Sequence, residues 1–160
     1  MKSVIAIYPG SFDPVTNGHL DLIERGSNIF GHLIVAVLRN TDKSPLFSVG
    51  ERLDMLREAV APYPNVEVDA FQGLLVEYAR QRQARVLLRG IRAVSDYEYE
   101  MQMAMMNRRL ESRMETIFMV PAEAYSYLSS RLVREIAKLG GSVSGLVPAS
   151  VEERLRIKIS

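Results

Sequence analysis

The sequence predicts an α/β domain in which a five-stranded parallel sheet carries helices on both faces. Short runs rich in β-branched and aliphatic residues indicate strands, and several are apolar throughout, as expected of strands buried on both faces. Helical patterns lie between these runs, and such alternation is typical of parallel strands joined by right-handed crossovers. The expected arrangement is therefore Rossmann-like and doubly wound. Its strands are expected at residues 4–8, 33–38, 66–69, 86–88 and 116–120.

Capping signals and apolar spacing predict the helices. A first helix is expected to begin near Gly18, with Asn17 as its N-cap. Ser-x-x-Glu patterns indicate capping boxes, in which the two side chains satisfy free amides at a helix start. They occur at residues 48–51, 95–98 and 150–153. Further helices are expected at 74–82 and 129–139, the second ended by Gly140 and Gly141.

The helix that follows residue 95 is apolar round most of its circumference. The residues responsible are Tyr97, Tyr99, Met101, Met103, Met105 and Met106. One interpretation is a core helix with adaptable Met packing, which would account for about half of that surface. The other interpretation is that its second face meets another subunit, since a helix apolar nearly all round needs cover on more than one side.

Length and composition restrict the function classes. The 160 residues fit one domain, 1–160, and the net charge of +1 argues against a general nucleic-acid-binding surface. The absence of cysteine excludes disulfides, thiolate catalysis and Cys-based zinc sites, and two His are too few for a His-built metal cage. Pro9 ends the N-terminal apolar run before it reaches signal-peptide length, and no later stretch approaches a membrane span. We expect a cytoplasmic protein that binds neither nucleic acid nor membrane.

Candidate binding residues follow the predicted strands. Ligands of open parallel sheets bind beyond the carboxyl ends of the strands. The residues at these positions are Ser11, Asp13, Thr16 and His19 after the first strand, Arg39 and Lys43 after the second, Arg89, Gly90 and Arg92 after the fourth, and Ser129 and Ser130 after the fifth. Cations, hydroxyls and glycines predict a polyphosphate site. The free amides of a helix start near Gly18 would hold phosphate oxygens, and His19 could donate a ring N–H to the same anion.

Neither common nucleotide loop is present, because both the P-loop spacing and G-x-G-x-x-G are missing. However, Thr16-Asn17-Gly18-His19 is similar to the [HT]-x-G-H signature of the nucleotidyltransferase superfamily. More narrowly, "YPGSFDPVTNGH", "RGIRAVSDYEYEMQ" and "YSYLSSRLVREIA" resemble the phosphopantetheine adenylyltransferase family, in order and over effectively the whole chain. Thr at the first signature position separates the chain from nicotinamide-mononucleotide adenylyltransferases and cytidylyltransferases, which usually have His there.

The resemblance implies transfer of the adenylyl group of ATP to the 4′-phosphate of phosphopantetheine, giving dephospho-coenzyme A and pyrophosphate. The acceptor phosphate is already an anionic nucleophile, so direct in-line attack without a covalent enzyme intermediate is expected. The catalytic residues implied are His19, which would stabilise the α-phosphate transition state, with Ser11 and Lys43. Arg89 would bind the pantetheine-side phosphate, and Leu75 would line the channel for the pantetheine arm.

The same resemblance implies a larger set of ATP-binding residues. They are Ser11, Phe12, His19, Gly90, Ile91, Arg92, Glu100, Tyr125, Ser126, Tyr127, Leu128, Ser129, Ser130 and Arg131. Arg131 stands where the family usually has Ser or Thr, so it would either serve the same anion or point to solvent. Judged without the resemblance, Glu100 reads as an exposed helix residue, and Ser129 and Ser130 as helix caps.

The expected ligands and partners follow. Asp13-Pro14 reads as a turn with no second convergent carboxylate, so Mg²⁺ is expected to arrive bound to ATP rather than at a dedicated protein site. The resemblance implies a homohexamer built as a dimer of trimers, with coenzyme A as a feedback ligand. Two alternatives stay open: a nucleotidyltransferase for another small phosphorylated acceptor, and a nucleotide-binding regulatory protein without catalysis.

Overall fold

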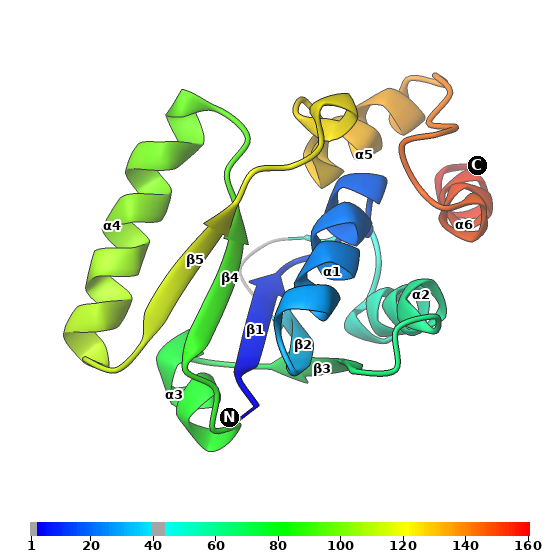
Figure 1. Cartoon of the computed structure of the whole chain (residues 1–160). Coiled ribbons are helices and arrows are strands. Elements are labelled where there is room, and N and C mark those ends of the chain that lie inside the picture. The colour runs from blue at the N-terminus through cyan, green and yellow to red at the C-terminus, as the bar shows by residue number, and fades with distance from the viewer. Residues whose placement is uncertain (1–2, 40–43) are drawn as a thin grey trace.

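The computed structural model describes residues 3–39 and 44–160. Its strands form one parallel sheet in the order β3-β2-β1-β4-β5 (Figure 1). The strands are β1 (Ile5–Gly10), β2 (His32–Leu38), β3 (Val66–Phe71), β4 (Val86–Gly90) and β5 (Glu115–Met119). All predicted strands are confirmed, and β1 and β4 extend to a glycine beyond their predicted ends.

The position of β1 explains its apolar sequence. It lies in the middle of the sheet, paired with β2 from Ile5 to Gly10 and with β4 at Ala6 and Ile7. Ala6 and Ile7 are fully buried, since helices cover both faces of the sheet there. The order of strands reverses between β1 and β4, and this switch point leaves a crevice beyond their carboxyl ends.

The helices cover both faces of the sheet, as predicted, and Figure 1 shows their placement. They are α1 (Asn17–Ile29), α2 (Val49–Val60), α3 (Leu75–Gln81), α4 (Val94–Leu110), α5 (Ser130–Lys138) and α6 (Ala149–Ile159), with a short 3-10 turn at Glu123–Tyr125. The larger core joins the sheet to α1, α2, α5 and α6. The smaller core lies between the other face and α3.

The predicted helix starts are confirmed in part. The capping box of α2 is present, because Ser48 Oγ accepts from the Glu51 amide and the Glu51 carboxylate accepts from the Ser48 amide. The boxes at 95–98 and 150–153 are wrong, since the N-caps are Ala93 and Pro148. Both helices begin one residue before the Ser of the pattern, so that Ser lies inside the first turn and not at the N-cap position.

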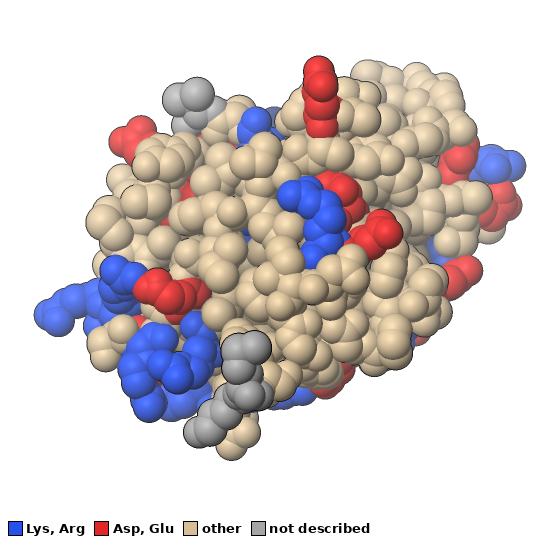
Figure 2. All heavy atoms as spheres, in the orientation of Figure 1, with Lys and Arg blue, Asp and Glu red and all other residues tan. Residues whose placement is uncertain are grey.

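The interpretation of α4 as a core helix is wrong for a single chain. Glu100 is buried, but Tyr97, Tyr99, Met103, Met105, Met106 and Leu110 of α4 lie at the surface, and Met105 is 60% exposed. In Figure 1 α4 runs beside β5 at the edge of the sheet, and in Figure 2 Lys and Arg gather near its C-terminal end. Within residues 3–39 and 44–160, no helix has both the length and the apolar character needed to cross a membrane.

Candidate functional site

A cavity of about 270 Å³ lies at the switch point, beyond the ends of β1 and β4. Six segments of the chain converge on it: the end of β1, the loop before α1, the start of α1, the end of β4 with the loop that follows it, α4, and residues 121–130. The lining residues are Tyr8, Pro9, Gly10, Ser11, Phe12, Thr16, Gly18, His19, Leu22, Arg89, Gly90, Arg92, Asp96, Glu100, Pro121, Tyr125, Leu128, Ser129 and Ser130. This is the edge of the sheet at which the sequence predicts a ligand.

His19 is held at the start of α1 by a capping box. Thr16, not Asn17 as predicted, is the N-cap: its hydroxyl accepts from the His19 amide at 3.3 Å. In return, the Thr16 amide donates to His19 Nδ1 at 2.9 Å. A ring nitrogen that accepts this bond carries no proton, so the proton of the neutral imidazole is on Nε2. His19 therefore has one N–H to offer to a ligand.

The charge of His19 is set by its surroundings. Burial, together with the positive charges of Arg92 and Arg89, lowers the pKa of His19 to about 3. The Phe12 ring packs edge-on against the imidazole, with centroids 4.9 Å apart. His19 is thus a neutral hydrogen-bond donor near pH 7. A neutral donor can stabilise a developing negative charge without a proton transfer.

Arg89 is the most strongly oriented cation of the cavity. Its Nε and Nη2 donate to the two carboxylate oxygens of Glu100 at 3.0 and 2.5 Å, and its Nη1 donates to the Pro9 carbonyl at 2.9 Å. Burial alone would lower the pKa of Arg89, but the bond to Glu100 raises it, so the guanidinium is charged. A guanidinium has five N–H groups, so these bonds leave one on each terminal nitrogen. Two N–H groups arranged as a fork suit a phosphate.

The opposite wall of the cavity adds a second helix start. Ser129 is the N-cap of α5, with Oγ accepting from the Leu132 amide at 3.1 Å, and Ser130 Oγ donates to the Pro14 carbonyl at 2.7 Å. Arg92 lies nearby, bonded to the Leu128 carbonyl and 3.3 Å from Asp96. The starts of α1 and α5 thus meet at one cavity, and the positive ends of both helix dipoles favour an anion there.

Two glycines make room for neighbouring side chains. A Cβ at residue 10 would lie 3.1 Å from the Phe12 ring, and one at residue 90 would lie 2.9 Å from Leu22 Cδ2. Glycine at both positions therefore has a reason internal to the fold. Both glycines allow the packing that brings the first loop and α1 against the ends of the strands.

The structure brings together most, but not all, of the predicted site residues. Those that line the cavity are Ser11, Phe12, His19, Arg89, Gly90, Arg92, Glu100, Tyr125, Leu128, Ser129 and Ser130. Ile91, Ser126 and Tyr127 do not line it, and Lys43 falls outside the described residues. Arg131 is bonded to Glu135 at 3.1 Å with its side chain 83% exposed, which favours the solvent-facing alternative. Leu75 packs against the smaller core.

Several lining residues were not predicted, and two had a signal in the sequence. Leu22 lies three residues after His19 on α1, on the same face of the helix, and Pro121 lies two residues beyond the end of β5. Tyr8 is buried, and this raises the pKa of its hydroxyl to about 12, so it is a neutral wall of the site. Asp96 lies in the first turn of α4 and pairs with Arg92 at 3.3 Å.

The carboxylates of the cavity are not arranged as a metal site. Asp96 is paired with Arg92, and both oxygens of Glu100 accept from Arg89. Across the described parts of the chain, no three His, Asp or Glu side chains form a group that could hold a metal ion. The donor set therefore suits a ligand that brings its own negative charge.

Comparisons with known proteins agree with this geometry. A family profile described as cytidylyltransferase-like matches residues 7–136. A phosphopantetheine adenylyltransferase from Aromatoleum aromaticum is 54% identical over 160 residues, which is 100% of this chain and 98% of that protein. The phosphopantetheine adenylyltransferase of Nostoc punctiforme is 59% identical over 148 residues, 92% of this chain and 81% of that protein.

A structural comparison supports the fold alone. A solved structure from Vibrio parahaemolyticus, provisionally named a nicotinate-nucleotide adenylyltransferase, superposes with a TM-score of 0.71 at 16% identity. The match covers 96% of this chain and 99% of that one. The five-stranded sheet with helices on both faces is therefore shared with a protein of remote sequence.

Proposed function

The chain belongs to the cytidylyltransferase-like family and, within it, to the phosphopantetheine adenylyltransferases, and we propose that its cavity holds ATP and 4′-phosphopantetheine for direct transfer of the adenylyl group. The products are dephospho-coenzyme A and pyrophosphate. The observation that carries this proposal is the convergence of two helix starts, His19 and the Arg89 fork on one cavity.

The chemical task is to bring two anions together. The acceptor phosphate attacks the α-phosphorus of ATP in line, the bond from that phosphorus to the bridging oxygen of pyrophosphate breaks, and no covalent enzyme intermediate forms. No general base is needed, because the attacking oxygen is already ionised. The protein contributes positioning and fixed donors around the phosphorus, where negative charge develops.

The donors of the cavity divide between the two substrates. Arg89 directs its two remaining N–H groups to the acceptor phosphate, and Ser11 contacts phosphates of both substrates. His19 donates Nε2–H to an α-phosphate oxygen. Gly90, Arg92 and the start of α5 hold the ATP. The neutral state of His19 and the preset fork of Arg89 support these roles. Lys43, outside the described residues, is kept as the third catalytic residue by its family position.

Mg²⁺ enters with ATP in this proposal, because the cavity carboxylates are engaged by arginines. When bound, the ion would neutralise part of the triphosphate charge. Among the described residues that line the cavity, no carboxylate pair is free to hold the ion independently of the nucleotide, so these residues act on the phosphate oxygens themselves.

An acceptor panel tests the function. Pyrophosphate release from ATP is measured with phosphopantetheine, nicotinamide mononucleotide and glycerol 3-phosphate, with ATP alone as the control. Release is expected with phosphopantetheine, accompanied by dephospho-coenzyme A. Turnover only with another acceptor would replace the proposed substrate. ATP binding without turnover would instead favour the regulatory alternative.

The proposed assembly is a homohexamer, a dimer of trimers. Its support in this chain is the exposed apolar surface of α4 and of β5, where Met105 is 60% and Ile117 is 39% exposed. Light scattering should give six times the 18.0 kDa of one chain. Met105→Glu should lower this mass, whereas Ile157→Glu on α6, where Ile157 is 67% exposed, is the matched control. A monomer mass for the wild type would contradict the assembly.

Feedback by coenzyme A and a cytoplasmic location complete the proposal. Coenzyme A contains the whole of the product, so it can occupy the same cavity, and inhibition competitive with ATP is expected. Inhibition that more ATP does not relieve would indicate another site. The cytoplasm is the compartment in which ATP and a phosphorylated acceptor are both available to the enzyme.

A further inference from the structure

The loop between β1 and α1 is fixed through its backbone carbonyls. The Ser11 carbonyl accepts from Arg52 Nη1 at 2.8 Å, the Asp13 carbonyl from Arg134 Nη1 at 2.6 Å, and the Pro14 carbonyl from Ser130 Oγ at 2.7 Å. These donors come from α2 and α5, which lie on different sides of the loop. Arg52 is itself only 3% exposed. The loop is therefore held from both sides.

Asp13 adds a tie to a second loop. Its side-chain oxygens Oδ2 and Oδ1 accept from the amides of Leu46 and Phe47, each at 2.9 Å, and the residue is 5% exposed. Leu46 and Phe47 belong to the segment that leads from β2 into α2. Bonds from two amides to one buried carboxylate are strong and directional. The carboxylate thus joins the loops that follow two neighbouring strands. Asp13 lines no part of the cavity, so it acts without touching a ligand.

Phe12 lies between Ser11 and Asp13, which make these hydrogen bonds, and it has an unusual backbone conformation. Its φ is +49°, a left-handed conformation that residues other than glycine and asparagine rarely adopt. This backbone directs a ring that is 3% exposed against the imidazole of His19, at 4.9 Å between centroids. A residue in such a conformation stays there only if its neighbours are fixed. The ties at Ser11 and Asp13 fix both neighbours.

We propose that Asp13 is a positioning residue for adenylyl transfer. Its carboxylate locks the loop, and thereby sets the position of Ser11 and holds the Phe12 ring against His19. The effect on turnover rests on the proposed function, whereas the effect on the His19 ring does not. The two are therefore measured separately.

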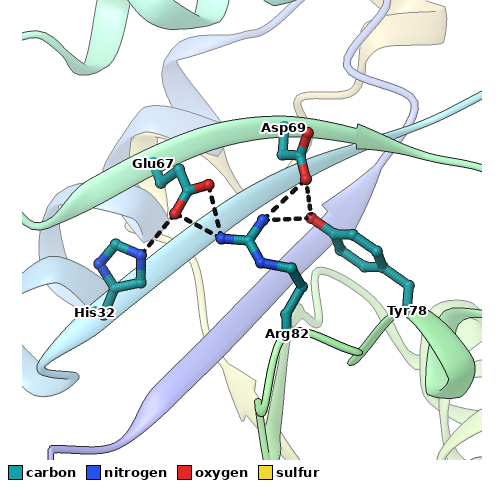
Figure 3. Close-up of polar contacts among 5 residues, drawn as sticks. All are labelled: His32, Glu67, Asp69, Tyr78 and Arg82. Atoms are coloured by element: carbon teal, nitrogen blue, oxygen red, sulfur yellow. Dashed lines mark hydrogen bonds and ion pairs between the residues drawn. The ribbon is translucent and has the colours of Figure 1, made fainter. Parts of the chain in front are cut away.

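The kinetic experiment uses Asp13→Asn, with Glu67→Gln as the matched control. The Asn side chain keeps one oxygen acceptor but places an NH₂ group opposite a backbone N–H. One of the two hydrogen bonds from the Leu46 and Phe47 amides is therefore lost. We expect kcat to fall at least about tenfold with the KM for ATP changed less than about threefold, because small displacements of reacting groups reduce turnover more than binding. Glu67 lies in a polar network on β3, outside the cavity (Figure 3). Its variant should keep kcat within about twofold.

The second experiment needs no substrate. The chain has two histidines, so their ring ¹⁵N signals can be assigned with single variants. Asp13→Asn should shift or broaden the His19 signals and leave His32 unchanged. Glu67→Gln should do the reverse, because His32 Nε2 is 2.9 Å from Glu67 Oε2. If the Asp13 carboxylate only stabilised the fold, Asp13→Asn would lower the unfolding midpoint but leave the His19 ring signals unchanged.

The outcomes separate the two proposals. A folded Asp13→Asn variant with kcat within about twofold of wild type and unchanged His19 signals would overturn the positioning role. Failure of the wild type to turn over any acceptor would count against the proposed function, while the His19 signals would still decide the role of Asp13. Should Asp13→Asn not fold, Arg134→Gln removes the donor to the Asp13 carbonyl and is evaluated by the same two measurements.

Discussion

Two clusters of charged side chains lie in different parts of the molecule, and both are organised around an arginine. In the cavity Arg89 is held by Glu100, and on the α3 side of the sheet Arg82 is held by Glu67 and Asp69 (Figure 3). Arg89 keeps an N–H on each terminal nitrogen and is next to two helix starts. The same ion-pair chemistry therefore presents donors to a ligand in the cavity and holds a helix against the sheet at the α3 side.

The α3 cluster, defined as His32, Glu67, Asp69, Tyr78 and Arg82, satisfies its charges internally. Arg82 Nη2 lies 2.7 Å from each oxygen of Glu67, and Tyr78 donates its hydroxyl to Asp69 at 2.6 Å. Burial opposes ionisation of both carboxylates, but the hydrogen bonds from Arg82, Tyr78 and His32 prevail and lower their pKa values. The carboxylates are on β3, and their main donors are Tyr78 on α3 and Arg82 at its C-cap, so the cluster holds that helix to an edge strand.

The largest expected effect comes from removing the neutral donor of the cavity. His19→Ala should lower kcat about 10²- to 10³-fold, about 3 kcal/mol, with little change in the KM for ATP, because a donor acting on the transition state is lost. Steady-state rates with saturating phosphopantetheine measure this. An unchanged turnover number would contradict the role of His19.

A second His19 variant separates catalysis from capping. His19→Gln retains a side-chain acceptor for the Thr16 amide, as Gln does in ordinary capping boxes. It should recover the thermal stability that His19→Ala loses while kcat stays well below wild type. Equal recovery of both would show that the imidazole serves only the helix start.

A smaller effect is expected when the partner of Arg89 is changed. Glu100→Gln places an NH₂ group against one N–H of the guanidinium and weakens a buried charged hydrogen bond, a change of about 1.5–3 kcal/mol. The KM for phosphopantetheine should rise about tenfold or more, with the KM for ATP nearly constant. Initial rates with each substrate varied in turn distinguish this from direct contact of Glu100 with ATP, which would raise the KM for ATP instead.

A change in the α3 cluster should lower the free energy of unfolding and leave kcat unchanged. Arg82→Ala leaves Glu67 and Asp69 without their shared cation and should cost about 1–2 kcal/mol, given that these groups are partly exposed. Urea unfolding measures this, and kcat should stay within about twofold. A kcat lowered tenfold would show that the cluster reaches the cavity.

The pH dependence of this stability has a definite sign. The folded-state pKa values of Glu67 and Asp69 lie below the ordinary values of 4.5 and 3.8, so the unfolded chain binds protons first. The stabilisation is present above these pH values and is lost as the pH falls through the lower, folded-state values. The difference between wild type and Arg82→Ala should therefore narrow under acid conditions.

The sequence predicted the sheet and the edge at which ligands bind, because buried parallel strands are apolar and each site loop follows one of them. It failed where distant segments decide the structure. The sequence indicated a turn at Asp13, because the amides that donate to its carboxylate are 33 and 34 residues away. It indicated an exposed side chain at Glu100, because the burial of this residue depends on Arg89. Similarly, the apolar residues of α4 predicted burial but could not identify what covers them.

The α3 cluster, by contrast, had a signal that was not used. Glu67 and Asp69 are two residues apart and so share one face of a strand, and Tyr78 and Arg82 are four apart on one face of a helix. Opposite charges at matching periods on consecutive elements indicate contact. The Arg89–Glu100 pair has no such repeat, because each element contributes one residue.

The smallest expected effect, the absence of a His19 titration near neutral pH, sharpens the contrast between the cavity and the α3 cluster. Because the pKa of His19 in the free protein is about 3, its ring signals should stay constant between about pH 8 and pH 5, the range in which an ordinary histidine titrates. In the unfolded chain His19 returns to its ordinary pKa of 6.5 and binds a proton below that pH. Its contribution to stability is therefore complete above pH 6.5 and is lost as the pH falls toward about 3. The free energy of unfolding of wild type relative to His19→Gln should decline in that window and stay level above it. A His19 signal that titrates near neutral pH would mean that the cavity does not keep the imidazole neutral. His19 would then act as a charged imidazolium and not as the neutral donor assigned here.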